Sequence, residues 1–143
     1  MLKEFQNKFK IEELKIFETE NWIFSLRPAQ CTLGAGVLSL KRPCFAASDL
    51  TPEELGNLSL AFKKIEKLLK IHFNYEKINY LMLMMVDAQL HLHVIPRYEK
   101  NIEMFGVLWK DEGWKGAPIL CDQNPDKEIQ HKIVKLLSEE VDI

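Results

Sequence analysis

Apolar and polar stretches alternate along the first forty residues and predict three short strands. Apolar residues gather at 14–17, 22–26 and 37–40, and polar or glycine-containing segments separate these runs. Short runs rich in Ile, Phe, Leu and Val, bounded by turn-forming residues, are typical of strands. We therefore expect the first part of the chain to supply three strands of one sheet.

A long helix is predicted to begin at Thr51. The residues Thr51-Pro52-Glu53-Glu54 place a hydroxyl at the N-cap, proline at the first helical position and Glu at the third. In this combination the N-cap hydroxyl accepts from the backbone N–H of the third helical residue, and the Glu side chain accepts from the N-cap N–H. Apolar residues then recur every three or four positions up to Leu69, while lysines occupy the other side, so one helix face should pack on the sheet.

The second half of the chain predicts two more strands and a final helix. Residues 78–86 are almost continuously apolar, which favours a central strand covered on both faces, with its three methionines in the core. Asp87-Ala88 would form a tight turn, and residues 89–98 would form the returning strand. A last amphipathic helix is expected to start at 124–126.

This order of elements predicts an α+β fold. We expect a mainly antiparallel five-stranded sheet with one long central helix and a C-terminal helix. Without repeats or a long Pro/Gly/Ser linker, residues 1–143 should form a single domain, with 99–143 as a C-terminal extension packed on it.

Composition narrows the classes of partner. Lys plus Arg number 19 against 21 Asp plus Glu, and the pI is near 6.1, so a basic nucleic-acid-binding surface is not expected. An odd number of cysteines, 3, without metal-finger spacing fits a reducing compartment, and the N-terminus lacks a signal-peptide pattern. We therefore expect a cytoplasmic protein that binds neither nucleic acid nor membrane.

The strongest candidate chemistry lies in the returning strand. Successive side chains of a strand alternate between faces, so Gln89, His91 and His93 should share one face, roughly 6.5 to 7 Å apart, with Leu90 and Leu92 on the other. A neutral imidazole nitrogen can attack phosphorus while a hydrogen bond to the other nitrogen fixes the tautomer. A neighbouring imidazole can stabilise the charge on a phosphoryl oxygen.

The His-x-His pattern alone leaves three interpretations open. The two histidines could be structural, they could ligate a metal such as Zn²⁺ together with Asp87, or they could be catalytic. His72 and His131, which lie near a helix end and in a charged helix, are expected to be solvated rather than catalytic.

The sequence QLHLHVIPRY resembles the signature of the histidine triad (HIT) family, and its Pro-Arg-aromatic ending is similar to the branch that hydrolyses dinucleoside polyphosphates. The resemblance extends to WIFSLRPAQCTLGAGVLSLKRP, to the helix capped by Thr51 and to NYLMLMMVD. These segments occur in the order of a HIT domain. A bacterial HIT subfamily also carries a tail like FGVLWKDEGWKGAP.

The resemblance implies a HIT-like fold and a nucleotide hydrolase or nucleotidyltransferase. His91 would attack the α-phosphate of a nucleotide conjugate and form a nucleotidyl-histidine intermediate. Gln89, His93 and Arg27 would bind the substrate, a purine nucleotide or a dinucleoside polyphosphate. No metal ligand in the chain and no cofactor at the nucleophile would be required, although a divalent metal could arrive with the substrate. HIT domains commonly form homodimers, so a homodimer is expected.

The sequence also departs from the family pattern. Gln89 stands at the first triad position and cannot become an imidazolium, and Ala35 stands where a Pro-Gly-His stretch often places histidine. The loop before the triad is predicted to be unusually short. These departures motivate an alternative hypothesis, a nucleotide-binding module with little or no turnover.

Overall fold

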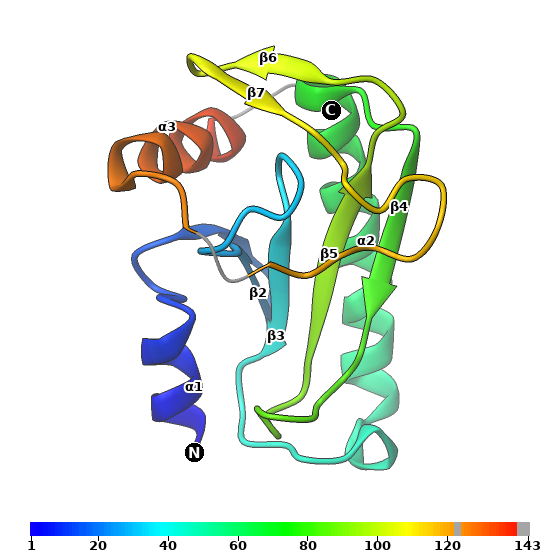
Figure 1. Cartoon of the computed structure of the whole chain (residues 1–143). Coiled ribbons are helices and arrows are strands. Elements are labelled where there is room, and N and C mark those ends of the chain that lie inside the picture. Colours follow the sequence, from blue (N-terminus) through cyan, green and yellow to red (C-terminus); the bar gives the residue numbers. More distant parts are fainter. Residues whose placement is uncertain (122–123, 140–143) are drawn as a thin grey trace.

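A five-stranded antiparallel sheet organises the chain, as predicted. The computed structural model describes residues 1–121 and 124–139 (Figure 1). The strand order is β1-β2-β3-β5-β4, and every neighbouring pair is antiparallel. The strands are β1 (Lys15–Glu18), β2 (Trp22–Leu26), β3 (Gly36–Leu40), β4 (Lys77–Leu81) and β5 (His91–Arg97). The predicted α+β fold is confirmed.

The long helix α2 (Pro52–Phe73) covers one face of this sheet and starts where the sequence predicts. The Thr51 hydroxyl accepts from the Glu54 N–H, and the Glu54 carboxylate accepts from the Thr51 N–H, which completes the capping box. The helix ends at Asn74 in the left-handed conformation, with φ 49°. Its buried side chains join the main core with those of β2, β3 and β5.

A short helix, α1 (Leu2–Lys8), covers part of the opposite face. Figure 1 shows α1 and α2 on opposite sides of β3. Phe5 and Phe9 form a second, smaller apolar cluster, whose other members are Ile11, Ile23 and Val37. The sequence did not predict α1, because two apolar positions in so short a segment give no helical periodicity to detect.

The apolar run at 78–86 is not a central strand. Strand β4 stops at Leu81 and lies at the end of the strand order, beside β5 alone among the described strands. Met85 and Val86 are 84% and 88% exposed, so the prediction that the whole run lies in the core was wrong. Ile78, Tyr80 and Met84 do pack against the main core. A continuous apolar run does not reveal by itself how far a strand extends or which faces are covered.

The turn predicted at Asp87-Ala88 is also wrong. Residues 82–90 form an extended irregular connection between β4 and β5, which we call the β4–β5 connection. Strand β5 then begins at His91, between β3 and β4. The loop before the histidines is therefore longer than the sequence predicted.

The C-terminal part adds a hairpin and a helix. Strands β6 (Ile102–Met104) and β7 (Val107–Trp109) form a separate two-stranded sheet. Helix α3 (Lys127–Ser138) follows Asp126, close to the predicted start, and buries Ile133 and Leu137 in the main core. A short 3-10 helix, η1 (Ala47–Asp49), precedes α2. None of the helices in residues 1–121 and 124–139 has the length and apolar character of a membrane span.

A buried ion pair attaches the segment after β7 to β5. The Arg97 guanidinium donates to both carboxylate oxygens of Asp111, at 2.7 and 3.1 Å, and the side chains are 4% and 2% exposed. The Tyr98 N–H also donates to Asp111. The division into one domain with an extension at 99–143 stays a prediction, since residues 122–123 and 140–143 lie outside the described part.

Replacing Asp111 with Ala should strongly destabilise the fold. The substitution leaves a buried guanidinium without its counter-charge, which typically costs about 3–5 kcal/mol. Urea unfolding of Asp111→Ala should show that loss in the free energy of unfolding. Lys110→Ala is the matched control, because Lys110 and its partner Glu112 are both exposed and such a pair contributes at most about 1 kcal/mol. Equal losses in the two variants would contradict the role of the buried pair.

Candidate active site

His91 and His93 lie side by side on the face of β5 that α1 covers. The alternation of β5 sends Leu92 and Val94 into the core beneath α2 and the two histidines to the other side. Their ring centroids are 5.0 Å apart and the rings are nearly perpendicular, at 80°. The shared face that the strand period predicts is therefore present.

A backbone hydrogen bond defines the protonation of the His91 ring. Its Nδ1 lies 2.6 Å from the carbonyl oxygen of Gln89. Because a carbonyl oxygen can only accept, Nδ1 must carry the proton, and in the neutral ring Nε2 then keeps the lone pair. That lone pair is the group that a nucleophilic imidazole requires.

Burial keeps both imidazoles neutral. His91 is 2% exposed and His93 7% exposed. Loss of hydration lowers the pKa of His91, and it lowers the pKa of His93 to about 4, with further contributions from His91 and Arg27. At neutral pH both rings are therefore uncharged.

Helix α1 supplies the aromatic cover of this pair. Phe5 packs against His91 with ring centroids 4.9 Å apart, and Phe9 lies 5.8 Å from His91 and 6.1 Å from His93. These tilted and edge contacts are favourable for aromatic rings. Phe5 and Phe9 thus cover the two imidazoles on this side of the sheet.

A cavity of about 300 Å³ opens beside the two histidines. This volume is at the lower end of the range for small-molecule sites. Its wall combines His91 and His93 with residues from four other places. These are the C-terminal end of α1, the segment after β2, the β4–β5 connection and the segment before α3, namely Lys8, Phe9, Arg27, Pro28, Ala29, 83–87 and Asn124.

Two cationic side chains belong to the cavity wall. Arg27 is 8% exposed, and its Nη1 donates to the carbonyl oxygens of Ala29 and Cys121 at 2.7 and 3.1 Å. Its buried Nε has no hydrogen-bond partner within the described ranges. Lys8 reaches across from α1 and donates to Asp87 at 2.7 Å. Because Asp87 lines the same cavity and offsets the charge of Lys8, the positive charge beside the neutral imidazoles comes from Arg27, which suits a phosphate group.

The structure brings three of the four predicted site residues together. His91, His93 and Arg27 line one cavity, whereas Gln89 lies outside its wall and hydrogen-bonds backbone groups of residues 40–44. Lys8 and Phe9 were missed, since nothing in the sequence indicated that the N-terminus folds over the histidines. The sequence pattern predicted residues 83–86 only as part of a strand, although their unbroken apolar character is also typical of a cavity wall.

The carboxylate of the metal-site interpretation is engaged by a lysine. Asp87 lines the same cavity as His91 and His93, but its carboxylate is paired with Lys8. In residues 1–121 and 124–139, no group of three or more His, Cys, Asp or Glu side chains has an arrangement that could hold a metal ion. His131 contacts Glu13 on the surface, as expected of a solvated histidine.

Comparisons with known proteins agree with this geometry. The family model for the HIT domain matches residues 37–100, which include β3, α2, β4 and β5. No curated protein sequence matches the chain significantly.

Several solved structures share the fold over most of the chain. A histidine triad protein from Sinorhizobium meliloti has a TM-score of 0.71 at 21% identity, covering 90% of both chains. A hypothetical histidine triad nucleotide-binding protein from Sulfolobus tokodaii has a TM-score of 0.67 at 18% identity, covering 87% of this chain and 80% of its own. A HIT family protein from Bacillus anthracis is 29% identical, with a TM-score of 0.55 over 69% of this chain and 73% of its own. Residues 37–100 are thus similar to a HIT domain, and the chain shares the fold of solved histidine triad proteins.

Proposed function

We propose that this protein is a nucleotide hydrolase or nucleotidyltransferase that works through a nucleotidyl-histidine intermediate at His91. The observation that carries the proposal is the hydrogen bond from His91 Nδ1 to the Gln89 carbonyl, which leaves an unprotonated Nε2 on a ring that lines a cavity. HIT domain proteins are generally nucleotide-binding proteins, and many are hydrolases or transferases.

The proposed reaction has two displacements at phosphorus. Nε2 of His91 first attacks the α-phosphate of a nucleotide conjugate, so an N–P bond forms while the bond to the leaving group breaks. The imidazole then carries a positive charge, which the Gln89 carbonyl stabilises by accepting from Nδ1. Water next attacks the same phosphorus and releases a proton to solvent, the electron pair of the N–P bond returns to Nε2, and the mononucleotide leaves neutral His91.

Other residues of the cavity would bind the substrate. His93 and Arg27 would contact phosphoryl oxygens, and Phe9 with the apolar part of the β4–β5 connection would pack on the base. The proposed substrate is a purine nucleotide conjugate or a dinucleoside polyphosphate. The nucleophile comes from the chain, so no cofactor would be required there, and any divalent metal would arrive bound to the substrate's phosphates. Action as a cytoplasmic homodimer is part of the same proposal.

The alternative of a nucleotide-binding module rests on a specific observation. His91 is almost fully buried and packs against Phe5, so α1 restricts approach to its ring. If α1 does not admit a phosphate to Nε2, the cavity would still bind a nucleotide without cleaving it. Turnover separates the two functions.

Removing the nucleophile should abolish turnover. Incubation with adenosine phosphoramidate and with diadenosine polyphosphates should release AMP, and mass spectrometry of quenched reactions should find a nucleotidyl adduct on His91. His91→Ala should reduce the rate by about 1000-fold or more, as loss of a covalent nucleophile does in other enzymes. His131→Ala, on the surface of α3, is the control and should retain the wild-type rate. Nucleotide binding without product or adduct would instead establish the binding module.

Acid should inactivate the enzyme only well below neutral pH. Protonation removes the His91 lone pair, and the pKa of each ring is below the 6.5 of an ordinary imidazole, with that of His93 at about 4. We expect kcat/KM to be constant near neutral pH and to fall as pH decreases below 6.5.

Since the unfolded chain binds these protons more readily, thermal stability should also fall as pH drops from 6.5 towards 4. An acid limb with its midpoint above pH 7 would contradict neutral, buried imidazoles.

Replacing Arg27 should weaken substrate binding. Arg27→Met keeps much of the side-chain volume but removes the positive charge beside the imidazoles. A hydrogen bond to a charged group contributes about 1.5–3 kcal/mol, so KM should increase by about 10- to 100-fold. Steady-state kinetics measure this change, and Lys132→Met, a substitution on the exposed side of α3, controls for loss of a cation. An unchanged KM would show that Arg27 acts only in packing.

A further inference from the structure

Gln89 binds the segment that follows β3 rather than the cavity. Its Nε2 donates to the carbonyl oxygens of Leu40 and Arg42 at 3.1 and 2.8 Å, and its Oε1 accepts from the Cys44 N–H at 3.2 Å. The residue is 1% exposed. Both amide donors and the carbonyl oxygen are thus engaged with main-chain groups of residues 40–44.

The main chain next to Gln89 is held by the same segment. The Leu90 N–H donates to the carbonyl of Cys44 at 2.8 Å, and the Leu90 carbonyl accepts from the Leu40 N–H at 3.2 Å. The peptide between Gln89 and Leu90 is therefore held on both sides. The side chain of Gln89 binds residues 40–44 on one side, and the backbone of Leu90 binds the same segment on the other. The carbonyl oxygen of this peptide is the acceptor for His91 Nδ1.

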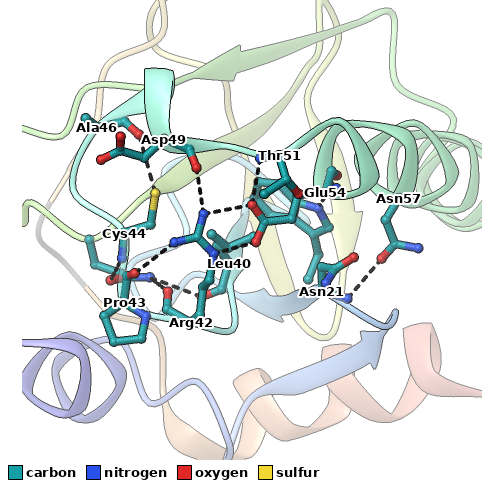
Figure 2. Close-up of polar contacts among 12 residues, drawn as sticks. Asn21, Leu40, Arg42, Pro43, Cys44, Ala46, Asp49, Thr51, Glu54 and Asn57 are labelled. Atoms are coloured by element: carbon teal, nitrogen blue, oxygen red, sulfur yellow. Dashed lines mark hydrogen bonds and ion pairs between the residues drawn. The ribbon is translucent and has the colours of Figure 1, made fainter.

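The segment 40–44 is itself anchored to the start of α2. Arg42 donates to both carboxylate oxygens of Glu54 at 2.7 and 2.8 Å and to the Asp49 carbonyl at 2.7 Å. Figure 2 shows Arg42 between Asp49, Thr51 and Glu54. Glu54 also completes the capping box. Hydrogen bonds thus connect the N-terminus of α2, through Arg42 and Gln89, with the ring of His91.

We propose that Gln89 is a positioning residue for His91 and not a substrate contact. By binding residues 40–44, its side chain holds the Gln89 carbonyl where it accepts from Nδ1, so that Nε2 stays the unprotonated nitrogen. This inference rests on the proposed function of His91 as nucleophile, and it assigns Gln89 a task in that reaction that needs no charge.

The shape of an amide explains why Gln suits this position. The site offers two carbonyl oxygens and one N–H, and an amide meets them with two donors and one acceptor. A neutral imidazole has one donor and one acceptor, so a histidine here would leave one carbonyl unpaired. Methionine is similar in length to glutamine but makes none of the three bonds.

Two substitutions of Gln89 test this role through their effects on the kinetic constants and on the protonation of the His91 ring. In Gln89→Met, kcat should fall by up to about 100-fold, because a small misplacement of a reacting group has that effect, while KM should change by less than about threefold. In ¹⁵N NMR, the two ring nitrogens of wild-type His91 should give distinct protonated and unprotonated signals, and Gln89→Met should average them. Gln89→His, which can keep two of the three bonds, should recover much of the lost kcat and of the signal separation.

Asn57→Ala is the control for stability. Asn57 is another side-chain amide that binds a main-chain N–H, that of Asn21, and it lies outside the cavity wall. This variant should lose thermal stability while keeping the kcat and the His91 signals of the wild type. Loss of stability alone would then not account for the result with Gln89→Met.

Each outcome decides the inference. A folded Gln89→Met with unchanged kcat and unchanged His91 signals would overturn it, and so would an increase in KM at constant kcat, which would make Gln89 a substrate contact. A wild-type His91 protonated at Nε2 would overturn it without any variant. If Gln89→Met does not fold, Gln89→His takes its place: a lower kcat at constant KM supports the inference, and unchanged kcat with unchanged His91 signals overturns it. If wild-type protein forms neither AMP nor adduct, the proposed function fails, whereas the NMR comparison still decides the role of Gln89.

Discussion

The two faces of strand β5 lie in different environments, and the rest of the structure depends on keeping each set of side chains on its own face. Its alternate side chains enter the main core beneath α2, while His91 and His93 occupy the opposite face beneath α1. A shift of one residue would exchange the two sets and place imidazoles in the apolar core. Pairing with β3 and β4 on both sides fixes the register that prevents this exchange.

The sequence predicted those parts of the fold whose signals are local. The capping box at Thr51 identified the start of α2, and short apolar runs identified β1 to β3. Prediction from the sequence failed where the structure of a segment depends on contacts with residues distant in the chain. Part of the apolar run 78–86 forms β4, and another part lines the cavity. The sequence cannot distinguish the two parts, because the difference depends on which segments lie next to each of them. Helix α1 depends on the sheet surface beneath Phe5 and Phe9 more than on any periodic pattern of its own.

The candidate site was predictable to the same extent. The strand period placed His91 and His93 together, and the resemblance to HIT proteins added Arg27, which lines the same cavity. The resemblance also gave Gln89 a binding role by position, whereas its hydrogen bonds lie with residues 40–44. Lys8 could not be predicted because its place beside the cavity depends on the packing of α1, a contact distant in sequence. The sequence pattern therefore predicted which side chains share a cavity better than it predicted the segments that surround them.

The ion pair between Lys8 and Asp87 joins α1 to the β4–β5 connection in the wall of the cavity. Lys8 is half exposed, so the pair contributes little to stability and can separate at small cost. Two peripheral segments thus contribute to the cavity wall, while the imidazoles stand on an inner strand of the sheet. Changes in the first few residues or in this connection can therefore alter the shape of the cavity and leave the two histidines in place.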